Sequence, residues 1–246
     1  MIGRSPYETD PSPTFVVETH SHTVNTGSVP EACLAAGAQL GERDGHVVAA
    51  LYGSTHGEIA ACMTHVGLAD RSDLGTLELR GDQSPLDLAL ADRLGDPPVA
   101  PGAARRQRGI WYLRLDRRRA LIVGAHGVLA KLPPIGASGH RSELVSNDIG
   151  AAIAIVSVVG TRSGRLLTAA GLAGDLDIGA IGRDPRDPNV VAILRESQRR
   201  VLILVRAPAV ETFWARLLEV GEPLGAAFVG CDALALLGAA SIQAPI

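Results

Sequence analysis

The sequence predicts an α+β fold made of two consecutive units that share one order of elements. In each unit an Asp-x-Gly triplet precedes a short strand, and a glycine, a helix and a β-hairpin follow; the triplets are Asp73-Leu74-Gly75 and Asp148-Ile149-Gly150. Neither unit has an obvious complete core, so we expect the two to share one system of sheets. The length of 246 residues suits one large domain or two intimate halves.

The first elements of the chain precede this repeated order. Residues 1–27 are rich in proline and polar residues and are expected to form a flexible arm. Ser28 and Glu31 form a capping box that opens a short helix. A strand is predicted over His46–Tyr52 because this run is apolar and bounded by glycines. A helix follows, and its apolar face carries Ile59, Cys62, Met63 and Val66.

The stretch Gly67–Gly81 is predicted to be a loop followed by a strand. Asp70, Ser72 and Asp73 have the short polar side chains that bond nearby backbone N–H groups in turns. Alternation over Thr76–Arg80 indicates a strand with its leucines on one side and its polar residues on the other.

A helix and a hairpin complete the first unit. The dipeptide Ser84-Pro85 opens the helix, and its buried stripe consists of Leu86, Ala89, Leu90 and Leu94. The hairpin pairs Ile110–Leu115 with Ala120–Val123. Its alternation places Trp111, Leu113 and Leu115 inward, and Tyr112 and Arg114 toward solvent. Residues 131–142, rich in Pro, Gly and Ser, are expected to form a connector.

The second unit repeats the order. An apolar strand is predicted over Ile153–Val159, then a short helix over Arg162–Ala170. Val190–Leu194 and Arg200–Val205 form the second hairpin. Pro208 opens a helix that Gly221 ends. Its apolar stripe consists of Val210, Phe213, Trp214, Leu217 and Leu218.

Composition excludes several classes of function. The net charge of −3 gives no global attraction to nucleic acid or to an anionic membrane. The three cysteines have no metal-binding spacing, and their sparse, odd count fits a reducing compartment. No run of about 18 apolar residues occurs, so we expect a cytoplasmic protein without a membrane segment.

Three local patterns have a functional interpretation and a simpler structural one. His20 and His22 have the spacing for a metal, but no third ligand accompanies them, so a polar arm is favoured and no metal site is assigned. The arginines of Arg105–Arg119 could bind RNA, with Trp111 and Tyr112 stacking on bases; a solvated or partner-facing hairpin is favoured. Gly160–Gly164 is neither a P-loop nor a dinucleotide fingerprint, and there is no G-x-S-x-G elbow.

A series of short motifs runs in one order through most of the chain. They are Gly37-Ala38, Tyr52, Glu58, the segment Gly67–Gly75, Gly160, the segment Phe213–Gly221 and the segment Gly230–Leu234. In this order they resemble the glycine-cleavage T-protein (aminomethyltransferase) superfamily, and within it the sarcosine oxidase gamma subunit. The resemblance implies duplicated ferredoxin-like α/β halves forming the T-protein-like folate-binding fold. The implied halves are residues 28–130 and 143–240, without the C-terminal β-barrel because the chain stops at Ile246.

The chain departs from this family at three functional positions. The family's catalytic Asp lies in a turn that corresponds to Arg105–Gly109, which has no carboxylate. The family's pterin-binding Glu lies in a turn that is shortened here to Arg195–Arg199, where Glu196 remains. An arginine of the family is replaced by Cys231. Unmatched groups around a buried pterin cost about 1–3 kcal/mol each, so the resemblance implies weak or lost tetrahydrofolate binding and no catalytic residue.

The resemblance therefore implies a non-catalytic, gamma-like subunit of a flavin-dependent sarcosine or amine oxidase complex in one-carbon metabolism. The flavin would lie in a partner subunit, because aromatic residues are only 3% of this chain. The arginine hairpin would be a docking surface for oxidase subunits. The polar groups of the degenerate folate cavity would be Tyr52, Asp70, Asp73, Glu196 and Asp232. Two alternatives stay open: a stand-alone tetrahydrofolate-dependent aminomethyl or methyl transferase, and a tRNA-binding relative.

Overall fold

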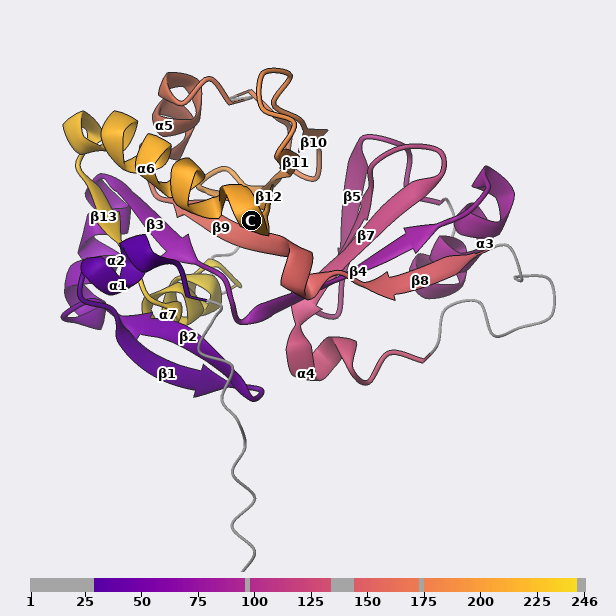
Figure 1. The fold of residues 1–246 in the computed structure, drawn as a ribbon, viewed down its shortest axis with the longest axis horizontal. Coiled ribbons are helices and arrows are strands. Elements are labelled where there is room, and N and C mark those ends of the chain that lie inside the picture. Colours follow the sequence, from indigo (N-terminus) through magenta and orange to yellow (C-terminus); the bar gives the residue numbers. More distant parts are fainter. Residues whose placement is uncertain (1–28, 96–97, 134–143, 173–174, 243–246) are drawn as a thin grey trace, which may run out of the picture.

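A computed structural model describes residues 29–95, 98–133, 144–172 and 175–242. A mixed six-stranded sheet and an antiparallel five-stranded sheet lie next to each other, and a two-stranded ribbon lies beside the larger one (Figure 1). The ribbon pairs β1 (Gln39–Arg43) with β2 (His46–Leu51). The six-stranded sheet has the order β10 (Ile181–Gly182), β11 (Val190–Ser197), β12 (Arg200–Arg206), β9 (Ile153–Val159), β3 (Val66–Asp70) and β13 (Ala226–Phe228). The five-stranded sheet has the order β5 (Ala103–Gln107), β6 (Ile110–Arg114), β7 (Arg119–Ala125), β4 (Leu74–Arg80) and β8 (Val145–Asp148).

Each sheet contains one strand from the other part of the chain. β3 pairs antiparallel with β9, although all the other antiparallel strands of that sheet follow residue 150. β8 pairs antiparallel with β4 in the sheet formed otherwise by residues 74–125. The two sheets also join at one edge, where the Ala104 amide donates to the Gly179 carbonyl at 2.6 Å. The sheets are therefore interlocked along the chain.

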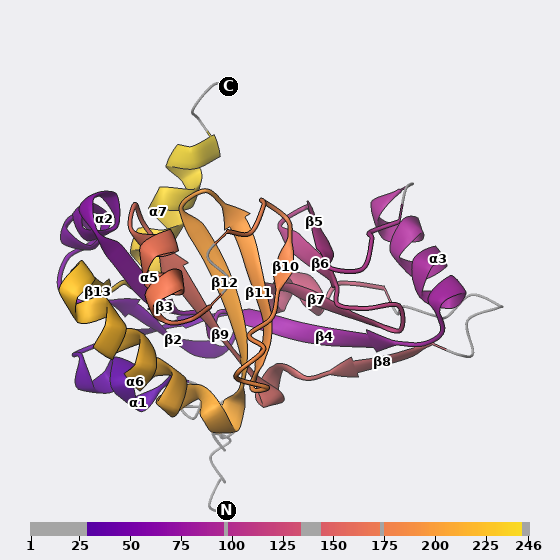
Figure 2. The same cartoon turned by 90° about the horizontal axis from the view of Figure 1, so that it is seen from above.

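Helices cover the outer faces of the sheets. They are α1 (Glu31–Ala35), α2 (Thr55–Thr64), α3 (Gln83–Leu94), α4 (His126–Leu129), α5 (Ser163–Ala169), α6 (Val210–Gly221) and α7 (Cys231–Ile242). α6 packs Phe213 and Trp214 against the six-stranded sheet, and α3 packs Leu86 and Leu90 against the five-stranded one (Figure 2). A third apolar cluster, with Trp111, Leu113, Ile155, Leu202 and Leu204, lies between the sheets. No helix among the described residues is long and apolar enough to cross a membrane.

The strongest sequence patterns are confirmed. The strand over Ile153–Val159 has the predicted bounds, and the two hairpins, α3, α5 and α6 lie where the periodicity predicted them. The helix α1 begins at Glu31 after Pro30, not at a Ser28 cap; Ser28 lies outside the described residues, as do residues 1–27. Most of the connector 131–142 is likewise outside them.

The prediction for the stretch Gly67–Gly81 is wrong in its first part. Val66–Asp70 is a fully buried strand, not the end of a helix followed by a loop. It has a strand on each side, so its backbone groups are satisfied by both neighbours. Met63, expected on a buried helix face, is 53% exposed. In β4 the polar side is not solvated, because Thr76 and Glu78 are also buried.

The first hairpin also differs from its predicted orientation. Tyr112 and Arg114, expected to face solvent, are buried because α3 covers that face of the sheet. Arg114 is 0% exposed, and its Nη2 lies 3.0 Å from Asp87 Oδ1 on α3. The hairpin lies between two apolar layers, and alternation alone cannot reveal a second covered face.

Candidate functional site

A cavity of about 570 Å³ opens where the β11–β12 turn, β5, α2 and the first turns of α7 meet. The Arg200 guanidinium at the start of β12 donates to the Leu234 carbonyl of α7 at 3.4 Å, so these two elements form adjacent walls of the cavity. The ribbon shows α7 and β12 next to each other (Figure 2). The charged lining residues are Arg43, Arg71, Arg106, Arg199, Arg200, Asp73 and Glu196. The rest of the wall is largely apolar and includes Met63, Val159, Leu234 and Leu237, with the thiols of Cys62 and Cys231.

The start of α7 is fixed by a buried carboxylate. Glu58 accepts hydrogen bonds from the Tyr52 amide at 2.6 Å and from the Gly230 amide at 2.7 Å. Gly230 lies so close to β2 that an added Cβ would be 2.0 Å from the Ala50 carbonyl oxygen. A side chain cannot fit there, so the glycine permits this contact. Glu58 and Gly230 thereby hold Cys231 at the cavity wall.

Asp73 is engaged by the neighbouring arginine. Arg71 donates to its two carboxylate oxygens at 2.7 and 2.9 Å, a bidentate geometry. Burial opposes ionisation of Asp73, but the hydrogen bonds and the charge of Arg71 outweigh it and hold the carboxyl pKa below its usual value.

The Cys231 thiol lies beside this carboxylate, with its Sγ 3.7 Å from Asp73 Oδ1. Burial first, and the Asp73 charge second, raise the pKa of the Cys231 thiol to about 12, so the thiol is protonated at neutral pH.

Glu196 is the second carboxylate of the cavity, and only one of its two oxygens accepts a hydrogen bond. The Trp111 indole donates to Oε1 at 2.7 Å, and Arg200 Nε lies 3.6 Å from Oε2. The Arg106 guanidinium lies over the Trp111 ring, 5.7 Å from its centroid. Because Trp111 and Tyr112 are only 7% and 4% exposed, neither presents a face on which an RNA base could stack.

The five predicted cavity residues occupy four different places. Asp73 and Glu196 line the cavity, and Asp232 lies next to it, in an ion pair of 2.5 Å with the lining residue Arg43. Tyr52 does not line it: its ring packs on Phe228 in the main core, 5.2 Å between centroids. Asp70 lies behind the wall, where its carbonyl oxygen is 3.9 Å from the Cys231 Sγ. Their roles in binding a cofactor remain predictions.

The arginines that line the cavity were not predicted as a group from the sequence. Arg43, Arg71, Arg106, Arg199 and Arg200 come from the ribbon, the β3–β4 turn, β5 and the second hairpin. Of these five, only Arg106 belongs to the basic run Arg105–Arg119. The shortened segment Arg195–Arg199 was a usable signal, because it contains one cavity arginine and directly precedes another.

Possible metal ligands are dispersed in the described part of the chain. No group of three or more His, Cys, Asp or Glu side chains there comes together in a way that could hold a metal ion. His20 and His22 lie outside the described residues. His46 stacks on His126 with 3.5 Å between ring centroids, a contact between β2 of the ribbon and α4.

Asp70 gives a pH-dependent stability. Burial raises its pKa from 3.8 to about 6, partly opposed by the hydrogen bonds from Ser72. Between these pH values the unfolded chain loses its proton first, so the free energy of unfolding falls as the pH rises and stays reduced above about 6. We expect Asp70→Asn to remove up to about 3 kcal/mol of this loss between pH 4 and 7, because each pKa unit is worth about 1.4 kcal/mol. Urea unfolding of both proteins at pH 4, 5, 6 and 7 measures how the free energy of unfolding depends on pH. Identical pH profiles for the parent and the variant would contradict this prediction.

Comparisons with known proteins place the fold. No family model matches the sequence, and no curated protein matches it. Among solved structures, the glycine cleavage system aminomethyltransferase T from Bartonella henselae is similar with a TM-score of 0.69 and 19% identity over 82% of this chain. The match covers 58% of that protein, so the chain spans less than two thirds of its length. A chain of the heterotetrameric sarcosine oxidase from Corynebacterium sp. U-96 matches with a TM-score of 0.56 and 19% identity, over 72% of this chain and 96% of that one. The chain thus has the T-protein-like fold that its motifs predicted.

Proposed function

We propose that this protein is a non-catalytic, gamma-like subunit of a flavin-dependent, amine-oxidising complex, and that its folate cavity is degenerate. One observation carries the proposal: three of the four carboxylate oxygens of the cavity already accept hydrogen bonds from the protein. Arg71 holds both oxygens of Asp73, and Trp111 donates to Glu196 Oε1, whereas Glu196 Oε2 has only the charge of Arg200 nearby, at 3.6 Å. Transfer of a one-carbon group needs a carboxylate that touches the reacting atoms, and an acid held in a bidentate ion pair is a poor base.

Two further observations support this assignment. The match to a chain of heterotetrameric sarcosine oxidase extends over 96% of that chain. The segment Arg105–Gly109, where the family has its catalytic acid, forms the end of β5 and a turn without a carboxylate. We also propose that the predicted halves, 28–130 and 143–240, are the two ferredoxin-like units of this fold, each exchanging a strand with the other.

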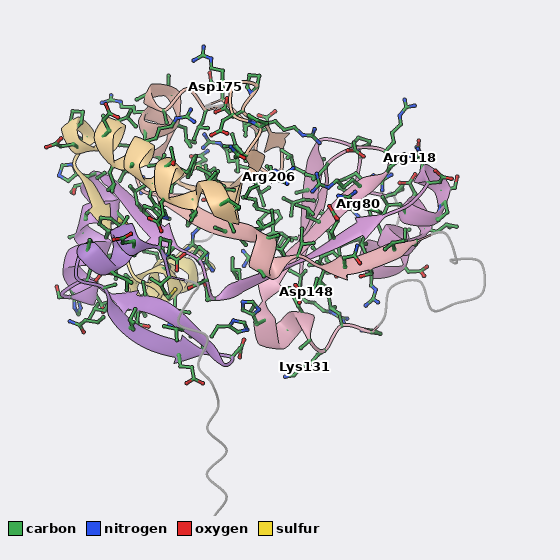
Figure 3. The ribbon with its side chains drawn as sticks, viewed as in Figure 1. Arg80, Arg118, Lys131, Asp148, Asp175 and Arg206 are labelled. Atoms are coloured by element: carbon green, nitrogen blue, oxygen red, sulfur yellow. The ribbon has the colours of Figure 1, made fainter. Side chains whose placement is uncertain are left out.

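The arginine turn between β6 and β7 is the proposed docking surface for the partner subunits. Arg117 and Arg118 are exposed, and Arg118 projects from the five-stranded sheet, where it forms an ion pair with Asp82 (Figure 3). Arg119 has a structural role instead, because it donates to the buried Glu78 at 2.6 Å. A test of docking should therefore change Arg117 and Arg118 and leave Arg119 in place.

Co-purification from the native cell tests the proposed function. We expect the tagged chain to elute in a complex larger than 25.6 kDa with the visible absorbance of a flavin. The double variant Arg117→Glu/Arg118→Glu should lose the partners while its thermal unfolding is unchanged, because reversed charges repel an acidic partner surface. Arg165→Glu, an exposed change on α5, is the matched control.

A colourless monomer or homodimer would contradict the subunit role. It would favour the second candidate, a stand-alone tetrahydrofolate-binding protein. The cavity volume supports that candidate, since about 570 Å³ lies within the range of pockets that hold small molecules and cofactors. Calorimetry with tetrahydrofolate then separates it from a protein that has lost the ligand altogether.

A further inference from the structure

We propose that the same cavity binds a small molecule that carries two or more carboxylate or phosphate groups, and that Arg106, Arg199 and Arg200 hold these groups. The inference rests on the proposed loss of folate chemistry, because it gives the remaining cavity a different class of ligand. The evidence for it is the number and pairing of the charged side chains that line the cavity.

The cavity has more cations than its acids can neutralise. Its lining contains five arginines but two carboxylates. Asp73 pairs with Arg71, Glu196 lies near Arg200, and Asp232 outside the lining pairs with Arg43. Arg106 and Arg199 form no ion pair among the described residues. Two guanidinium groups at the cavity are therefore available for an anion that the protein itself does not supply.

Arg200 is the third member of the proposed site, and its charge is poorly compensated. Its Nε atom is buried without a hydrogen bond, since Glu196 Oε2 is 3.6 Å away. Burial lowers the Arg200 pKa; the Glu196 charge opposes this shift, and the charges of Arg71 and Arg106 add to it. These cations are thus close enough to repel one another. An anion bound among them would relieve the repulsion and satisfy the buried donor.

The surroundings of the arginines suit charged recognition. Arg106 is supported by the Trp111 ring, and its position over that ring limits its conformations. Val159, Leu234 and Leu237 form an apolar wall on one side of the cavity, and interactions between charges are stronger beside such a surface than in bulk water. The first turn of α7, a 12-residue helix, borders the cavity at Cys231, and the positive end of a helix dipole favours an anion.

The same features argue against a ligand that mainly donates hydrogen bonds. A pterin ring presents several N–H donors, but three of the four carboxylate oxygens of the cavity already accept hydrogen bonds, and only Glu196 Oε2 has no hydrogen-bond partner. A cavity of about 570 Å³ is also larger than one inorganic ion requires. A compact multivalent anion fits both the volume and the donors, since guanidinium groups bind carboxylate and phosphate oxygens in the same fork geometry.

Calorimetry on the isolated full chain tests the inference. Citrate is the polycarboxylate probe and inorganic pyrophosphate the phosphate probe, each compared with sodium chloride at equal ionic strength. We expect saturable binding of at least one probe and none of chloride. Arg106→Gln/Arg199→Gln should weaken that binding at least tenfold, and the exposed Arg165→Gln on α5 should leave it unchanged.

The outcomes separate the proposals. Binding of citrate alone would assign a polycarboxylate, and binding of pyrophosphate alone a phosphate compound. No saturable binding, or binding that the double variant leaves intact, would overturn the inference. Thermal unfolding of each variant verifies that the fold persists. Because these measurements use the isolated chain, their failure is distinct from a failure of co-purification, which tests the subunit role.

Discussion

Replacing Gly230 with alanine is expected to destabilise the protein by about 3 kcal/mol or more. The added Cβ would lie 2.0 Å from the Ala50 carbonyl oxygen and 2.5 Å from the Leu51 amide nitrogen. Both atoms belong to the backbone of β2, so no side-chain rotation can relieve the clash. Moving Gly230 away from the ribbon would also break its 2.7 Å hydrogen bond to Glu58. Urea unfolding followed by circular dichroism measures the loss.

The matched control is Gly164→Ala on α5. A Cβ at Gly164 meets nothing within 4 Å, and alanine is favoured over glycine inside a helix by up to about 1 kcal/mol. The control variant should therefore be as stable as the parent or slightly more stable. If Gly230→Ala unfolds at the same urea concentration as the control, this would contradict the close contact between Gly230 and the backbone of β2.

The second large effect is expected at the ion pair between the buried Arg114 and the partly exposed Asp87. Asp87→Asn should cost about 3 kcal/mol, because it leaves a buried guanidinium without its counter-charge. Arg114 is 0% exposed, and its Nε and Nη1 atoms have no hydrogen-bond partner. Its remaining contact is a hydrogen bond of 2.7 Å to the Arg117 carbonyl. Chemical denaturation at neutral pH measures the change.

A double variant separates charge from packing at this site. Arg114→Met/Asp87→Asn removes both charges and keeps the volume of the side chain between the sheet and α3, so it should recover most of the lost stability. If the double variant is no more stable than Asp87→Asn, the cost arises from packing rather than from an unpaired charge.

Patterns that one element carries by itself were predictable from the sequence. The stripe of α6 and the apolar run of β9 appear in the residues of those elements, and the structure has both where expected. The orientation of Arg114 was not predictable, because its burial depends on α3, which covers the face of the sheet that alternation assigns to solvent. The five-residue strand β3 was missed because its glycine and aspartate mimic a loop, while both its neighbours come from much later in the chain.

The site was predictable only in part for a similar reason. Asp73 and Glu196 were proposed because they are carboxylates within segments that correspond to functional segments of a known family, and both line the cavity. The cavity arginines come from distant segments, and only the basic run around Arg106 and the shortened segment Arg195–Arg199 gave any sign of them in the sequence. Tyr52 was selected with them although its ring lies in the core against Phe228. A motif places a residue along the chain, but the packing of the elements determines whether its side chain reaches a cavity.

The exchange of β3 and β8 between the sheets also governs how the protein can be made. Neither sheet is complete until residues on both sides of position 140 have left the ribosome, because β4 requires β8 and β9 requires β3. An emerging first portion therefore has an open strand edge and an uncovered apolar face until the later strands arrive. Pairings between such distant segments give a high contact order and slow folding. The nascent chain is consequently exposed to aggregation during synthesis, and the finished sheets gain or lose their structure together.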